Sequence, residues 1–281
     1  MFQRCILFFL GIFILGACAA YEPQYRESNS AEAVFPSEKT IEKTFYLVGD
    51  AGLSPMGGLS DGLTALKNLI RSEETTNDYT IYLGDNIYPD GMPEKGEPDR
   101  RAAENAIDAQ INALKDFEGE IVFIPGNHDW YNNGLQGLNR EAKYLKEITG
   151  KDLMKPSRGC PIETELEKHQ NKTILFAMHH PMFSYGTHGG NYALKKHLYP
   201  LQKKIPMPGL ASLVAQIRSQ GGVSVQDRYN ELYNELMKKL AVITKKSDRL
   251  VFASGHEHTM HHIENDGLIQ IQTGTADKDL R

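Results

Sequence analysis

The sequence is poor in features that define several classes of protein. Three cysteines among 281 residues are too few for a disulfide framework. Basic residues are not in excess, since 31 Lys and Arg face 36 Asp and Glu, so the net charge of −5 gives no reason to expect nucleic acid as a partner. With 40% hydrophobic and 24% charged residues, the composition excludes a disordered or coiled-coil chain. We expect a globular protein with one large domain.

Long apolar runs are absent except at the N-terminus. There, Arg4 precedes an apolar stretch that ends at Leu15 and is followed by small residues. This pattern is typical of a secretory signal, because the stretch is too short to span a bilayer. The tetrapeptide Leu-Gly-Ala-Cys that ends at Cys18 resembles the bacterial lipoprotein box. The resemblance implies a lipoprotein signal peptide over residues 1–17 and a lipid anchor on Cys18, in the bacterial cell envelope. The alternative is a plain signal peptide cut near Ala19 or Ala20.

The segment after the signal is polar and shows little apolar periodicity. Residues 18–40 contain Glu, Ser, Gln and Pro, which predicts a flexible tether. One domain is expected over residues 41–281, and all candidate functional residues fall within it.

Five short apolar runs of this domain each stop at a polar cluster. The runs span residues 44–48, 79–83, 121–124, 173–177 and 250–253. Continuous runs of this length are typical of strands that are buried on both faces. The clusters that follow them are Gly-Asp-Ala-Gly, Gly-Asp-Asn-Ile-Tyr, Gly-Asn-His-Asp, Met-His-His-Pro and Gly-His-Glu-His.

Helical patterns lie between the runs and predict an α/β layered domain. They place apolar residues at Leu63, Leu66 and Ile70, at Ile107, Ile111 and Leu114, and in a stripe of Tyr229, Leu232, Tyr233, Leu236 and Leu240. In such sheets the ligand site lies beyond the carboxyl ends of the strands. The polar clusters are therefore expected to meet at one edge.

Together the clusters supply oxygen and nitrogen donors of the kind that hold metal ions. The candidates are Asp50, Asp85, Tyr88, Asn127, His179, His256 and His258. Mixed carboxylate, imidazole and amide ligands suit Zn, Fe and Mn better than Ca or Mg, and no cluster contains the cysteines of a structural zinc site. Taken singly, each aspartate has an alternative interpretation as a helix cap or turn residue.

The order of the five clusters resembles that of calcineurin-like metallophosphoesterases, and in particular their purple acid phosphatase branch. Most of that superfamily has a His two residues after the first Asp, where this chain has Gly52. The purple branch lacks this His and uses a Tyr three residues after the second Asp, which matches Tyr88 after Asp85. The resemblance implies a four-layer α/β/β/α sandwich of two mixed sheets. Because such proteins usually continue with further strands, the alternative is a domain truncated at its C-terminus.

The same resemblance implies the metals and their ligands. One metal is expected on Asp50, Asp85, Tyr88 and His258, and the second on Asp85, Asn127, His179 and His256, with Asp85 as the bridge. The implied ions are Fe(III) together with Fe(II), Zn(II) or Mn(II).

The implied reaction is hydrolysis of phosphate esters, chiefly monoesters, with metal-bound hydroxide attacking phosphorus. His128 and His188 are expected to contact phosphate and assist the leaving group. Asp129 is expected to orient His128, with helix capping as its alternative role. The neighbouring Tyr131 is interpreted either as a wall of the pocket or as a cover of the core. A phosphodiesterase or pyrophosphatase that uses the same site is the alternative function.

Overall fold

The computed structural model describes residues 41–276, apart from residues 72–75, 157–161, 193–197, 199–205, 208, 210–211, 215–216, 218–220, 246, 248 and 266. The predicted signal peptide, the tether and the anchor at Cys18 lie outside the described residues. In the part of the chain that is described, every helix is too short or too polar to cross a bilayer.

The first sheet consists of three parallel strands in the order β1-β2-β3. These strands are β1 (Phe45–Val48), β2 (Tyr79–Tyr82) and β3 (Glu120–Phe123). Helix α2 (Asp61–Ile70) joins β1 to β2, and α3 (Arg100–Ala113) joins β2 to β3. Parallel neighbouring strands need crossover connections of this kind. Helix α4 (Leu135–Thr149) follows the third strand. This sheet is parallel throughout its described strands, so the expectation of a mixed sheet does not hold for it.

The second sheet is mixed, as expected, and has the order β4-β5-β7-β6. Its strands are β4 (Ile174–Ala177), β5 (Leu250–Ser254), β6 (His261–Asn265) and β7 (Leu268–Gln272). Strands β4, β5 and β7 run parallel, whereas β6 and β7 form an antiparallel pair. Helices α5 (Ile162–Lys168) and α8 (Glu231–Thr244) precede β4 and β5.

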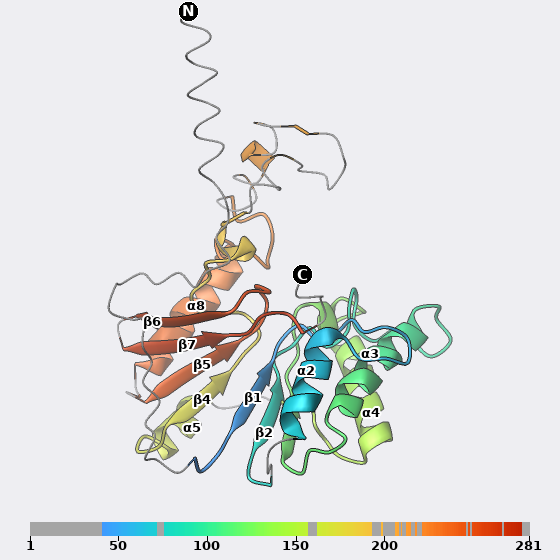
Figure 1. The fold of residues 1–281 in the computed structure, drawn as a ribbon. Helices are drawn as coiled ribbons and strands as arrows, with labels where there is room; N and C mark the ends of the chain where they lie inside the picture. Colours follow the sequence, from blue (N-terminus) through green and yellow to red (C-terminus); the bar gives the residue numbers. More distant parts are fainter. Residues whose placement is uncertain are drawn as a thin grey trace, which may run out of the picture.

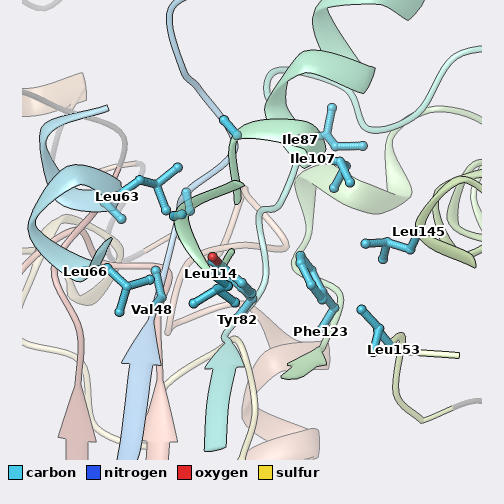
Figure 2. Packing of buried hydrophobic residues seen from close by; sticks show 14 of the residues in the cluster. Val48, Leu63, Leu66, Tyr82, Ile87, Ile107, Leu114, Phe123, Leu145 and Leu153 are labelled. Carbon is cyan, nitrogen blue, oxygen red and sulfur yellow. The ribbon is translucent and has the colours of Figure 1, made fainter. Parts of the chain in front are cut away.

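Three apolar clusters hold the domain in four layers (Figure 1). One cluster lies between the first sheet and helices α2, α3 and α4, where Tyr82 and Phe123 stack with ring centroids 4.4 Å apart (Figure 2). Another joins the second sheet to α5 and α8. The third, which includes Ile81 of β2 and Ala253 of β5, lies between the two sheets. Both faces of each sheet are thus covered, which explains the continuous apolar runs.

The helical patterns identify buried faces with mixed success. Leu63, Leu66 and Ile70 are the buried residues of α2, as predicted. The stripe predicted for α8 is partly wrong, because Leu232 and Leu236 are exposed. Its buried face consists of Tyr233, Met237, Leu240 and Thr244. That face meets the second sheet, and it includes Met237, which is absent from the predicted stripe.

The two sheets also join through the backbone at the edge where the parallel strands end. Gly49, just after β1, pairs with Thr275, which follows β7. The Ala276 amide donates to the Gly49 carbonyl at 3.0 Å, and the Thr275 hydroxyl donates to the Asp50 carbonyl at 3.0 Å. The polar clusters of both sheets therefore lie along the line where these backbone contacts join the two sheets, which we call the seam.

Candidate metal centre

The seam collects the side chains that follow five strands of the two sheets. Asp50 follows β1, Asp85 follows β2 and Asn127 follows β3. His179 follows β4, and His256 and His258 follow β5. Asp50, Asp85, His179 and His256 are each at most 4% exposed. One donor atom from each of Asp50, Asp85 and His179 lies within 4.8 Å of the others, so these three residues could hold a metal ion.

The Tyr88 hydroxyl is the centre of a first group of donors. Its oxygen lies 3.1 Å from Asp50 Oδ1, 3.1 Å from Asp85 Oδ2 and 3.1 Å from His258 Nε2. His258 Nε2 also lies 3.1 Å from Asp50 Oδ1. The four side chains that the resemblance assigns to one metal thus point their donor atoms at one another.

The imidazole of His179 is the centre of a second group. Its Nε2 atom lies 3.3 Å from Asp85 Oδ1, 3.1 Å from Asn127 Oδ1 and 3.2 Å from His256 Nδ1. Asp85 belongs to both groups, with one carboxylate oxygen in each. This is the arrangement that a bridging ligand requires.

The hydrogen bonds of the two imidazoles indicate that a cation belongs between them. His179 Nδ1 lies 2.7 Å from the Leu83 carbonyl, and His256 Nε2 lies 2.9 Å from the Gln226 carbonyl. Each of these nitrogens must carry a hydrogen to donate to its carbonyl, so both inward nitrogens present lone pairs. Two lone pairs 3.2 Å apart are compatible only with a shared proton or a metal ion. The residues present therefore fit a metal centre.

The charges at the site favour the same interpretation. Burial lowers the pKa of His179, but the nearby carboxylate of Asp85 outweighs it and raises this pKa to about 9. Without metal, a proton on Nε2 therefore takes the position of the cation, and metal binding would release it. Burial holds the pKa of His256 well below its ordinary value, which keeps that imidazole neutral and able to ligate.

The backbone at the ligands is held in a conformation that is unfavourable for residues with side chains. Asp50, Asp85, His256 and His258 have φ angles of 54°, 55°, 75° and 57°. Such left-handed residues concentrate at functional sites, where surrounding contacts compensate their cost. Gly126 makes one of these contacts, because its backbone packs directly against the Asp85 carboxylate. A Cβ at this position would lie 2.2 Å from Asp85 Oδ1. Only glycine lets the third cluster approach the bridging carboxylate this closely.

His128 lies at the rim of the two donor groups, whereas Asp129 has a role other than the expected one. The His128 side chain is 27% exposed, its Nδ1 contacts the Pro89 carbonyl, and its Nε2 lies 3.9 Å from Asp85 Oδ2. Asp129 is fully buried and accepts hydrogen bonds from the backbone amides of Asn86, Ile87 and Gly126. The expectation that Asp129 orients His128 is therefore wrong.

The reason is local geometry. The short 3-10 helix η1 (His128–Trp130) directs the two adjacent side chains to opposite sides, one toward the rim and one into the interior. Asp129 links the loops of the second and third clusters through these hydrogen bonds. Burial, and to a smaller extent the negative charge of Asp85, raises the pKa of Asp129 to about 7.

His188 also reaches the site, in the short 3-10 helix η2 (Thr187–Gly189). Its ring centroid lies 4.2 Å from that of His256. Its Nδ1 lies 2.8 Å from Oδ1 of Asp227, a fully buried carboxylate, and its backbone amide donates to Glu257 Oε2 at 3.0 Å. Sequence reasoning missed both acidic partners. Glu257 could have been suspected from its place between two ligands, whereas no motif surrounds Asp227.

Comparison with known proteins identifies the family. A protein-family model described as calcineurin-like phosphoesterase matches residues 43–260 of the sequence. The chain belongs to this family. It is also 28% identical over 152 residues to purple acid phosphatase 7 of Arabidopsis thaliana, a similarity that covers 52% of this chain and 39% of that protein. This chain thus matches well under half the length of that curated relative.

Among solved structures, the chain is similar to GAP50, described as the anchor in the inner membrane complex of Plasmodium, with 15% identity and a TM-score of 0.45. That match covers 82% of this chain and 70% of GAP50. A phosphopantetheinyl hydrolase of Mycobacterium tuberculosis matches with 13% identity and a TM-score of 0.37, over 83% of this chain and 90% of the hydrolase. The stretch that matches the family model, residues 43–260, contains all seven candidate ligands.

Proposed function

We propose that this calcineurin-like protein hydrolyses phosphate monoesters at a dinuclear metal centre. The sharing of Asp85 between the two donor groups carries the proposal, because each of its carboxylate oxygens faces a different group. Asp50, Tyr88 and His258 complete one proposed ligand set. Asn127, His179 and His256 complete the other.

The Tyr88 phenol favours Fe(III) at the first position, with Fe(II), Zn(II) or Mn(II) at the second. When bound, the two ions would polarise the phosphoryl oxygens and activate water for attack on phosphorus. The partial similarity to a plant purple acid phosphatase supports a phosphatase activity.

In this proposal the residues around the donor groups act on the substrate through hydrogen bonds. His188 directs Nδ1 to Asp227, which leaves Nε2 free to hold a proton for the departing alkoxide. His128 directs Nδ1 to the Pro89 carbonyl, so its Nε2 faces away from that contact and, in the imidazolium form, donates to a phosphoryl oxygen. Glu257 anchors the backbone of His188 and so places this imidazole beside His256.

The proposal is tested by metal analysis combined with a panel of esters. We expect about two ions per chain and a kcat/KM for p-nitrophenyl phosphate at least about tenfold above that for bis(p-nitrophenyl) phosphate or pyrophosphate. Chelation should abolish hydrolysis, and re-addition of metal should restore it.

Two histidine variants sharpen this test. His179→Ala should lose metal and activity, whereas His169→Ala, which alters a histidine with a 44% exposed side chain outside the site, should change neither. A preference for the diester would favour the phosphodiesterase alternative. Fewer than one ion per chain in active wild-type protein would contradict the dinuclear centre.

We further propose that Cys18 carries a lipid that holds the domain, through the tether of residues 18–40, to a membrane of the bacterial cell envelope. The Leu-Gly-Ala-Cys tetrapeptide supports this location. Cys18→Ser is expected to move the protein from the membrane fraction to the soluble fraction, measured by fractionation of expressing cells. Wild-type protein found entirely in the soluble fraction would contradict the anchor.

A further inference from the structure

Tyr131 lies beside the proposed metal centre without being a member of either donor group. It follows η1, and it is 42% exposed. Its ring centroid lies 4.9 Å from that of His128, with the planes inclined at 60°. The phenol therefore stands next to the imidazole that is proposed to face the phosphoryl group.

The phenol oxygen of Tyr131 accepts two hydrogen bonds. Asn127 Nδ2 donates to it at 3.0 Å, and Gln226 Nε2 is the second donor. Two donors occupy both acceptor positions of the oxygen, so its own hydrogen must point elsewhere. Among the residues that the structure describes, no acceptor receives that hydrogen.

The position of this phenol is fixed by the second donor group. Asn127 turns its oxygen to His179 Nε2 and its nitrogen to Tyr131. Gln226 links the phenol to His256, another member of the second donor group. The backbone carbonyl of Gln226 accepts a hydrogen bond from His256 Nε2 at 2.9 Å. The contacts form a closed circuit through Asn127, Tyr131, Gln226, His256 and His179. A hydrogen-bond donor held in this way needs little further ordering when it meets a ligand.

We propose that Tyr131 is a substrate-binding residue that donates its phenolic hydrogen to an oxygen of the phosphoryl group. This inference rests on the proposed function, because it takes phosphate esters as the ligands of the site. The partial exposure of Tyr131 leaves its hydroxyl accessible, and a phosphoryl oxygen is a strong, charged acceptor. A purely structural role predicts a different outcome: the phenol would serve only to orient Asn127.

Tyr131→Phe separates the two roles, because it removes the hydroxyl and keeps the ring. The measurement is calorimetric binding of inorganic phosphate to the metal-loaded protein, together with metal content and with kcat and KM for p-nitrophenyl phosphate. A hydrogen bond to a charged group predicts phosphate binding weaker by roughly tenfold and a similar fall in kcat/KM, with metal content unchanged. Tyr79→Phe is the matched control, because Tyr79 begins β2 at the opposite end of the sheet.

Each result decides the question. Phosphate affinity equal to that of the wild type in Tyr131→Phe would overturn the inference. Loss of metal together with affinity would also overturn it, since the hydroxyl would then only hold Asn127 in place. If the wild type binds phosphate but hydrolyses none of the esters, the proposed function fails, while the comparison of phosphate affinities still reports on Tyr131.

Discussion

Asp85→Asn is expected to empty the proposed centre of metal and to reduce kcat/KM by more than about 100-fold. Residues that merely orient a metal ligand contribute about 10- to 100-fold in affinity or activity, so a shared ligand should contribute more. Asp85 is 2% exposed, and its two oxygens face His179 Nε2 and the Tyr88 hydroxyl. The substitution removes the negative charge that both donor groups share. Metal content and ester hydrolysis measure the effect.

Asp78→Asn is the matched control for this prediction. Asp78 precedes β2 and Asp85 follows it, so the same change is made at opposite ends of one strand. Asp78 is 8% exposed, and its Oδ1 accepts from the Thr44 amide at 2.8 Å. Its substitution should lower the free energy of unfolding by about 1 kcal/mol and leave the metal content intact. Two ions per chain in Asp85→Asn would contradict the bridging role.

The strand ends were predictable because burial on both faces makes a strand apolar along its whole length. A run that stops abruptly at Gly and a polar residue therefore indicates where the chain leaves the sheet. Parallel pairing then brings Asp50 and Asp85 to the same edge without any knowledge of side-chain contacts. The family match over residues 43–260 agrees with the order of clusters from which the resemblance was inferred.

The partners of the site residues were less predictable, because they depend on contacts between distant segments. Asp129 is next to His128 in sequence, yet a tight turn separates their side chains, so adjacency was misleading. Asp227 lies 39 residues from the imidazole that it contacts and belongs to no apolar run or helix pattern. The exposed stripe of α8 shows the same limit, because apolar composition alone does not tell which helix face meets the sheet.

Asp227→Asn is expected to lower kcat by about 100-fold while KM changes by less than about threefold. The carboxylate of Asp227 accepts from His188 Nδ1 at 2.8 Å and so fixes which nitrogen of the ring faces away. An asparagine can present its amide nitrogen instead, and the ring then loses its fixed tautomer and orientation. Such a change affects the step that needs the proton more than it affects the binding of the ester.

A double-mutant cycle distinguishes this positioning role from a general loss of stability. If Asp227 acts only through His188, then Asp227→Asn should cost nothing further in a His188→Ala background. Asp116→Asn is the control, because Asp116 forms an exposed ion pair with Arg71 and should leave kcat unchanged. Losses that multiply in the double variant would contradict the pairing. If the double variant instead loses no more kcat than His188→Ala alone, the segment around Asp227, which lies outside all five clusters, is part of the proposed catalytic apparatus.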